Sequence, residues 1–139
     1  MRGAAQFTCV AIGGRGLLIS GKPGSGKSSL ALALIDRGAA LVGDDGVMLA
    51  KEQGKLVAAP HFNIVGKLEV RNLGLLDFPV SPSVPVALAV MLDPEAPRFI
   101  EEAEILVIEG VALPQVRLWP DSPGLALKAE LALARFGVT

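Results

Sequence analysis

The stretch GKPGSGKS at residues 21–28 constrains this chain more than any other segment. It matches the pattern G-x-x-x-x-G-K-[ST], in which glycines let backbone amides turn toward a polyphosphate. A short apolar run at residues 16–20 precedes it and predicts a buried strand. A run rich in Leu and Ala at residues 28–37 follows it, and this run predicts a helix that ends at Gly38. Strand, loop and helix therefore stand in the order that a phosphate-binding loop requires, with a helix N-terminus that favours an anion.

The loop itself supplies the first set of candidate binding residues. The predicted contacts of the nucleotide phosphates are Gly21, Gly24, Ser25, Gly26 and Lys27. Lys27 would reach the β- and γ-phosphates, and the Ser28 hydroxyl would ligate Mg²⁺. The loop therefore predicts a site for a nucleotide and Mg²⁺.

Composition narrows the class of protein. The 139 residues are 51% apolar and 19% charged, which predicts one packed domain spanning residues 1–139 rather than a disordered chain. A net charge of −1 and the scarcity of aromatic residues argue against nucleic acid as a partner. No apolar run approaches the ~20 residues of a membrane span, and the first residues lack a signal-peptide layout. The single cysteine, Cys9, lies in an apolar run and is expected to be buried. We expect a soluble, cytoplasmic protein that does not bind membranes.

Strand and helix patterns alternate along the rest of the chain, which predicts an α/β domain. Gln53-Gly54 predicts a hairpin turn between two strands, and the proline-rich residues 79–85 predict a loop. Strands are predicted at residues 6–12, 39–45, 47–50, 56–59, 68–71, 86–92 and 105–108, the last two of them buried, and a second helix at residues 125–136.

Several carboxylates could serve phosphoryl transfer, which needs an acid near the metal and a group that orients the acceptor. Asp44 and Asp45 end a predicted strand, where adjacent side chains point in opposite directions. Asp93 competes with them, because it also follows an apolar strand. Glu69 and Arg71 share one face of a predicted strand and would look into the site.

Three segments together resemble the HPr kinase/phosphorylase catalytic domain. They are the loop at residues 21–28, Asp44-Asp45 sixteen residues after Ser28, and LEVRNLGL at residues 68–75. The similarity is clear over about residues 8–76 and weaker over 111–135. It implies an α/β P-loop domain around a mixed β-sheet, similar to the nucleotide-binding core of phosphoenolpyruvate carboxykinase, and a hexameric assembly. It also implies ATP- and Mg²⁺-dependent phosphorylation of a serine of HPr, and removal of that phosphate by inorganic phosphate to give pyrophosphate.

The resemblance also implies roles for single residues. Asp44 would be the base that takes the seryl proton, with Asp45 beside it, and Glu69 would join Ser28 as a metal ligand. Arg98 would stabilise charge on the transferred phosphoryl group. The segment 77–85 would be the loop that meets HPr and a neighbouring subunit. Because the chain begins near the catalytic domain, it is expected to be the short form without the family's N-terminal domain.

Three departures from the family pattern leave other functions open. Gln6 stands where members often have a histidine, and Asn72 stands where the signature prefers glycine. Ser29 stands where an acidic residue usually follows the loop serine. These changes keep open a regulatory protein that binds ATP and Mg²⁺ without transferring phosphate. A small-molecule P-loop kinase is a further alternative, which predicts Asp93 rather than Asp44 as the essential acid.

Overall fold

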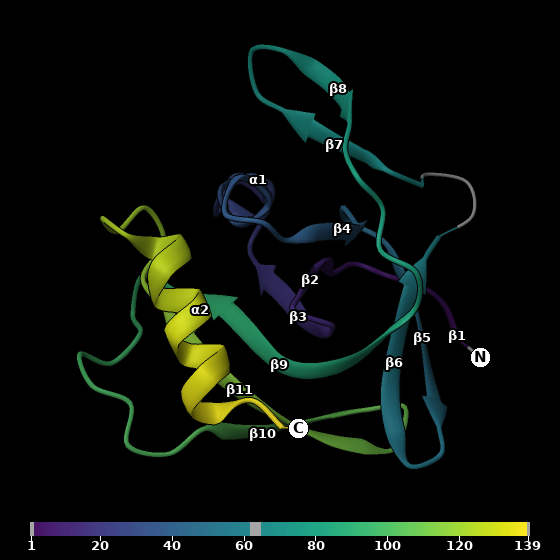
Figure 1. The fold of residues 1–139 in the computed structure, drawn as a ribbon. Helices are drawn as coiled ribbons and strands as arrows, with labels where there is room; N and C mark the ends of the chain where they lie inside the picture. The colour runs from purple at the N-terminus through teal and green to yellow at the C-terminus, as the bar shows by residue number, and fades with distance from the viewer. Residues whose placement is uncertain (1, 62–64, 139) are drawn as a thin grey trace.

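The computed structural model describes residues 2–61 and 65–138 (Figure 1). Two helices and eleven strands are defined in this part of the chain. The elements are β1 (Arg2–Ala5), β2 (Thr8–Ile12), β3 (Arg15–Gly21), α1 (Lys27–Asp36), β4 (Ala40–Gly43), β5 (Val47–Glu52), β6 (Lys55–Pro60), β7 (Lys67–Val70), β8 (Gly74–Asp77), β9 (Val84–Leu92), β10 (Glu104–Ile108), β11 (Val111–Leu118) and α2 (Leu125–Phe136).

The main sheet is mixed and is built around β9. Strand β9 pairs in parallel with β3 and with β11, whereas its first residues pair antiparallel with β6. The path β1-β5-β6-β9-β3-β2-β4 continues the sheet, and β10 joins it through an antiparallel pairing with β11. The register sets Gly21 opposite Leu92, so the ends of β3 and β9 meet at one edge. The expectation of an α/β domain around a mixed sheet is confirmed.

The two faces of the central strands carry separate hydrophobic clusters. On one face Leu17 and Ile19 of β3 pack with Leu30 and Leu34 of α1 and with Leu133 of α2. On the other face β2, β3 and β9 pack against the β5–β6 hairpin in a second cluster. Figure 1 shows this hairpin on the far side of the sheet from the helices. Because α1 buries apolar residues against the sheet, β7 and α2, it needs no broad polar face.

Both predicted helices and the predicted turn are confirmed. Helix α2 covers the predicted residues 125–136, and α1 begins at Lys27, one residue before the predicted start. The turn residues Gln53 and Gly54 have φ angles of +54° and +80°, as a tight hairpin requires. Within the described residues, neither helix is long and apolar enough to cross a membrane.

The prediction of a buried strand at residues 105–108 is wrong in one respect. The strand β10 forms, but Ile105 and Val107 are 67% and 65% exposed. Strand β10 pairs only with β11, and no described element covers its outward face. Strand β11 was not predicted, because Pro114 interrupts its apolar pattern. Strand β9 begins at Val84, so the predicted loop is shorter than residues 79–85.

Strands β7 and β8 form a separate two-stranded sheet that stands beside α1 (Figure 1). The predicted strand at residues 68–71 is observed as β7, with Leu68 buried and Glu69 exposed. Asn72 lies in the turn with a φ of +75°, a conformation that asparagine tolerates better than most residues. The turn therefore accepts Asn72 in place of the glycine that the family signature prefers.

Candidate functional site

The glycine loop connects β3 to α1 at the edge of the sheet. Strand β3 ends at Gly21 and α1 begins at Lys27. Gly24 and Gly26 have φ angles of +82° and +102°, which side chains rarely adopt. Gly21 has a φ of +153°, and a Cβ atom there would collide with the Ser25 Oγ. All three glycines are therefore required by the backbone path of the loop.

The inside of this loop fits an anion. The hydroxyls of Ser20 and Ser25 are buried and have no hydrogen-bond partner among the described residues. The Lys27 ammonium bends back and donates to the Gly21 carbonyl at 3.2 Å. A Cβ atom on Gly24 would meet nothing within 4 Å, so the loop is open above this glycine. Buried hydroxyls, a lysine and the N-terminus of α1 form a group of donors that suits a phosphate.

Asp44 is tied to the end of this loop by hydrogen bonds. The Ser28 hydroxyl donates to Asp44 Oδ1 at 2.7 Å, and the Thr8 hydroxyl donates to the same oxygen at 3.1 Å. The backbone N–H of Glu69 donates to Asp44 Oδ2 at 3.3 Å. Three donors from β2, α1 and β7 therefore hold one carboxylate in a single orientation beside Ser28.

Glu69 and Arg71 face the same cavity as the loop. This cavity of about 310 Å³ is also lined by Lys27 and Ser28, and by Asp121 from the segment between β11 and α2. In residues 2–61 and 65–138 no group of three or more His, Cys, Asp or Glu side chains could hold a metal ion by itself. Protein Mg²⁺ sites commonly use only one or two carboxylates together with substrate phosphates. Ser28 and Glu69 fit that smaller donor set, because they line one cavity.

A second cavity, of about 770 Å³, borders the loop on the β9 side. Arg117 of β11 binds the Asp93 carboxylate at 3.0 Å and the Glu104 carboxylate at 2.8 Å. The backbone N–H of Glu95 and the Arg117 guanidinium lower the pKa of Asp93 below its usual value. The same guanidinium lowers the pKa of Glu104, and the two carboxylates raise the pKa of Arg117. Asp93 is therefore held by an ion pair in this structure, whereas Asp44 is held at Ser28.

Two predicted site residues lie apart from this arrangement. The side chain of Asp45 is exposed, and its backbone N–H donates to the Thr8 hydroxyl at 3.3 Å. Arg98 lies in the segment between β9 and β10 and lines a different cavity, beside α2. Its guanidinium stands 5.6 Å from the centroid of the Phe99 ring. Its position gives no support to the role expected for Arg98 at the phosphoryl group.

Sequence reasoning missed Thr8, Arg117 and Asp121. Thr8 is fully buried and links the two aspartates, because it donates to Asp44 and accepts from the Asp45 amide. Its one signal in the sequence is a hydroxyl at the start of an apolar strand. Arg117 and Asp121 carry no local signal, since only the pairing of β11 with β9 brings them to the loop.

Comparison with known proteins decides the family. Residues 3–81 match the family described as "HPr Serine kinase C-terminal domain". The matched range is more than half of the chain and contains the glycine loop, Asp44 and Glu69. The chain belongs to this family. The resemblance noted in the sequence is thus confirmed.

Individual relatives agree with this assignment. The chain is 35% identical over 130 residues to the HPr kinase/phosphorylase of Streptococcus thermophilus, covering 84% of this chain and 42% of the relative. It is 48% identical over 66 residues to that of Clostridium tetani, covering 48% of this chain and 22% of the relative. The chain thus spans less than half the length of these relatives. The solved structure of the Hpr(Ser) kinase/phosphatase from Coxiella burnetii superposes with a TM-score of 0.84 at 28% identity, covering 96% of this chain and 89% of that one.

Proposed function

We propose that this protein is an ATP-dependent protein-serine kinase that phosphorylates the phosphocarrier protein HPr. We further propose that it catalyses the reverse phosphorolysis of phosphoseryl-HPr by inorganic phosphate. Membership of the family supports the reaction class. The observation that carries the proposal is the hydrogen bond from Ser28 at the loop to Asp44, next to a cavity lined by Glu69 and Arg71.

Asp44 is the proposed general base. The seryl oxygen of the substrate would attack the γ-phosphorus of ATP, the bond to the bridging oxygen of ADP would break, and Asp44 would take the seryl proton. In reverse, an oxygen of inorganic phosphate would attack the phosphoserine phosphorus and form pyrophosphate. The protonated Asp44 would then return its proton to the leaving seryl oxygen. One carboxylate serves both directions because the same proton moves in each.

The loop and Glu69 would hold the nucleotide and the metal. Gly21, Gly24, Ser25, Gly26 and Lys27 would bind the phosphates, and Ser28 and Glu69 would hold Mg²⁺. Bound Mg²⁺ would neutralise charge on the phosphate oxygens. A hydroxyl has one proton and two lone pairs, so Ser28 can donate a hydrogen bond to Asp44 and still coordinate a metal ion through a lone pair. Asp44 would therefore also orient a metal ligand.

The β7–β8 hairpin is the proposed contact for the protein substrate. Leu73 and Leu75 are 70% and 68% exposed, and they follow Glu69 and Arg71 of the phosphate cavity. Clustered exposed leucines are typical of surfaces that bind another protein. The segment 77–85, which follows the hairpin, would extend this contact.

We infer that residues 1–139 act as one catalytic domain of a cytoplasmic homo-oligomer, a hexamer by resemblance to the family. The exposed side chains of Ile105 and Val107 on β10, and of Leu127 and Leu131 on α2, leave apolar surface that a neighbouring subunit would cover. Light scattering coupled to size exclusion would measure the number of subunits.

The decisive experiment is mass spectrometry of HPr from the same organism. HPr is incubated with the protein, ATP and Mg²⁺, and phosphoseryl-HPr is incubated separately with inorganic phosphate. The wild type should add one phosphate in the first reaction and remove it in the second. Asp44→Asn should slow both reactions by roughly 10²- to 10⁴-fold, because Asn cannot take a proton. Asp45→Asn is the matched control and should change the rate little, because its side chain is exposed, whereas the Asp44 carboxylate is held at Ser28 by a hydrogen bond.

One observation favours the alternative of an ATP- and Mg²⁺-binding regulator without transfer activity. Gln6, at the position where family members often have histidine, cannot accept a proton, and it is exposed in the bend before β2. Binding of ATP that requires Lys27, with no phosphate gained or lost by HPr, would refute the kinase and support an ATP- and Mg²⁺-binding regulator. Phosphate transfer from ATP to a small-molecule acceptor that is lost in Asp93→Asn but not in Asp44→Asn would instead point to a small-molecule P-loop kinase.

A further inference from the structure

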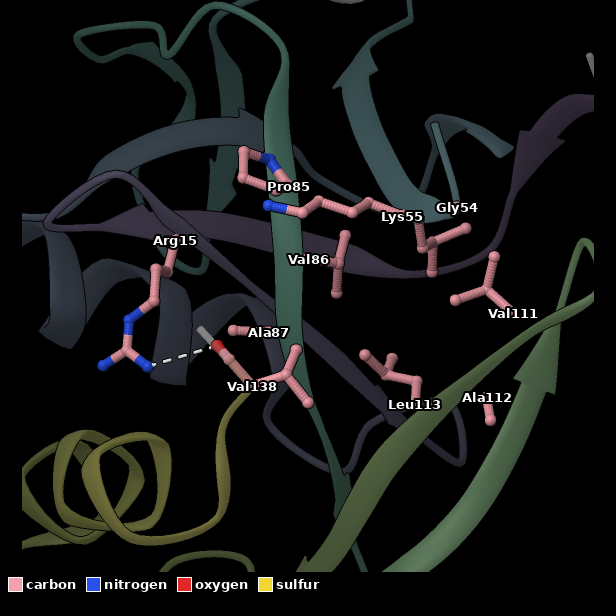
Figure 2. Close-up of a pocket in the computed structure, with 11 residues that line it drawn as sticks. Arg15, Gly54, Lys55, Pro85, Val86, Ala87, Val111, Ala112, Leu113 and Val138 are labelled. Carbon is pink, nitrogen blue, oxygen red and sulfur yellow. Dashed lines mark hydrogen bonds between the residues drawn. The ribbon is translucent and has the colours of Figure 1, made fainter. Parts of the chain in front are cut away.

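A cavity unrelated to the glycine loop lies at the other end of the same two strands (Figure 2). Strand β3 begins at Arg15, which lines this cavity, and ends at Gly21 of the loop. Strand β9 likewise contributes Val86, near its start, to this cavity. Its last residue, Leu92, lines the cavity beside the loop. The proposed function makes no use of this space, which measures about 250 Å³.

The floor of the cavity is apolar. Val86 and Leu113 are 4% and 1% exposed, and they contribute side chains from β9 and β11. Figure 2 shows Val111 beside Leu113 and facing the β9 strand. Apart from two cationic residues, the lining consists of apolar residues and one glycine. Such a floor favours a ligand with a hydrocarbon body.

The two polar side chains at the rim are both cations. Lys55 follows the turn into β6, is exposed, and has no hydrogen-bond or ion-pair partner among the described residues. Arg15 donates one hydrogen bond, at 3.4 Å, to the backbone carbonyl of Val138. A guanidinium has five N–H donors, so Arg15 retains others for a ligand. Figure 2 shows Lys55 extended toward Pro85, and Arg15 on the opposite side of β9 from Val111. No acidic residue lines the cavity.

We propose that this cavity binds a small amphipathic carboxylate. The hydrocarbon body would lie on Val86, Val111 and Leu113, and the carboxylate would lie at the rim, where Lys55 and Arg15 make the cavity positive. The combination of an apolar floor and two cations favours an amphipathic anion over other ligand classes. A cation would face two like charges, a neutral hydrocarbon would leave the cations unused, and a sugar would leave its hydroxyls without partners on the apolar floor. The volume lies below the ~300–1,000 Å³ of sites for drug-sized ligands, so the ligand is small.

The test is an NMR titration of the ¹⁵N-labelled protein with hexanoate in the absence of nucleotide. We expect saturable shifts of the amides at residues 85–87 and 111–113, with a dissociation constant on the order of 1 mM for so few atoms. Affinity should rise roughly fourfold for each methylene added from butanoate to hexanoate. 1-Hexanol, which has the same body without the charge, should bind more weakly. No saturable shift, or shifts of equal strength with hexanol, would overturn the proposal.

Two variants locate the head group. Lys55→Gln and Arg15→Gln should each weaken hexanoate binding roughly two- to fivefold, the scale of an exposed charge pair. Lys51→Gln is the matched control, because Lys51 is an exposed lysine of the same hairpin that does not line the cavity. Equal affinity in all three variants would refute the head-group assignment. Since nucleotide and HPr are absent from the titration, its result is independent of the proposed kinase activity.

Discussion

Replacing Thr8 by valine tests whether a buried hydroxyl organises the two aspartates. Thr8 is fully buried at the start of β2, where its Oγ1 donates to Asp44 Oδ1 at 3.1 Å and accepts from the Asp45 N–H at 3.3 Å. Valine has nearly the same shape, so Thr8→Val removes both hydrogen bonds without opening a cavity. The Asp44 carboxylate would keep its bonds to Ser28 and to the Glu69 amide, but it would lose the donor on the β2 side.

The expected loss of stability in Thr8→Val follows from the two hydrogen bonds that the hydroxyl makes. A hydrogen bond to a charged acceptor contributes about 1.5–3 kcal/mol to the free energy of unfolding, and a neutral one about 0.5–1.5 kcal/mol. Both bonds are longer than ideal, and valine recovers some free energy because it suits a strand and buries an extra methyl group. We expect a net loss of about 2 kcal/mol in the free energy of unfolding. In a chain of this length such a loss lowers the Tm by roughly 6 °C.

Urea unfolding and HPr phosphorylation measure the two consequences. Thr8→Ser is the matched control, because it keeps the hydroxyl and removes only a methyl group. Thr8→Val should lose stability relative to Thr8→Ser and should transfer phosphate at least tenfold more slowly, with an unchanged KM for ATP. Equal stability and equal rates in the two variants would show that the Thr8 hydroxyl neither supports nor orients Asp44.

Three further predictions follow from other parts of the structure. Gly21→Ala should abolish ATP binding in an equilibrium titration, because its Cβ atom would strike the Ser25 hydroxyl, and adding Ser25→Gly should restore part of the affinity. Arg117→Gln should reduce the free energy of unfolding at pH 7, and this difference should shrink as pH falls below about 4 in urea titrations. The sign follows because Arg117 lowers the pKa of its two carboxylate partners, so their contribution is complete above their ordinary pKa values of 3.8 and 4.5 and is lost on protonation. Burial raises the pKa of the Cys9 thiol to about 12, so a thiol reagent at pH 8 should modify the protein no faster than it unfolds.

Local patterns predicted those parts of the fold whose cause is local. The helices at residues 27–36 and 125–136 follow from runs of Leu and Ala, and the turn at Gln53-Gly54 follows from the residues that a positive φ favours. The exposure of β10 could not be predicted in this way. Ile105 and Val107 have the residue types of a buried strand, and only the sheet order shows that β10 lies at an edge.

In the candidate site, too, residues with a local sequence pattern were predicted, and residues brought together by strand pairing were missed. The loop and Asp44 follow from their residue types and spacing, and the structure joins them through Ser28. Thr8 was missed because the pairing of β2 with β4 is what brings it to Asp44. Arg117 was missed because sequence order does not reveal that β11 lies beside β9, at the end where the loop stands.

The parallel pairing of β3 with β9 has a consequence for how the site is assembled during synthesis. Residues 16–21 pair with residues 86–92, so the strand that carries the loop gains its second partner only after a segment far along the chain has joined the sheet. Bringing β9 to β3 closes a long loop and lowers the conformational entropy of the chain before the strand contacts can form. Such long-range parallel pairings form slowly. A growing chain could form the β2–β3 hairpin and α1 early, but β3 would lack its parallel partner until β9 has been synthesised. The nucleotide site would therefore be completed only after β9 has been synthesised, although the glycine loop precedes β9 in the chain.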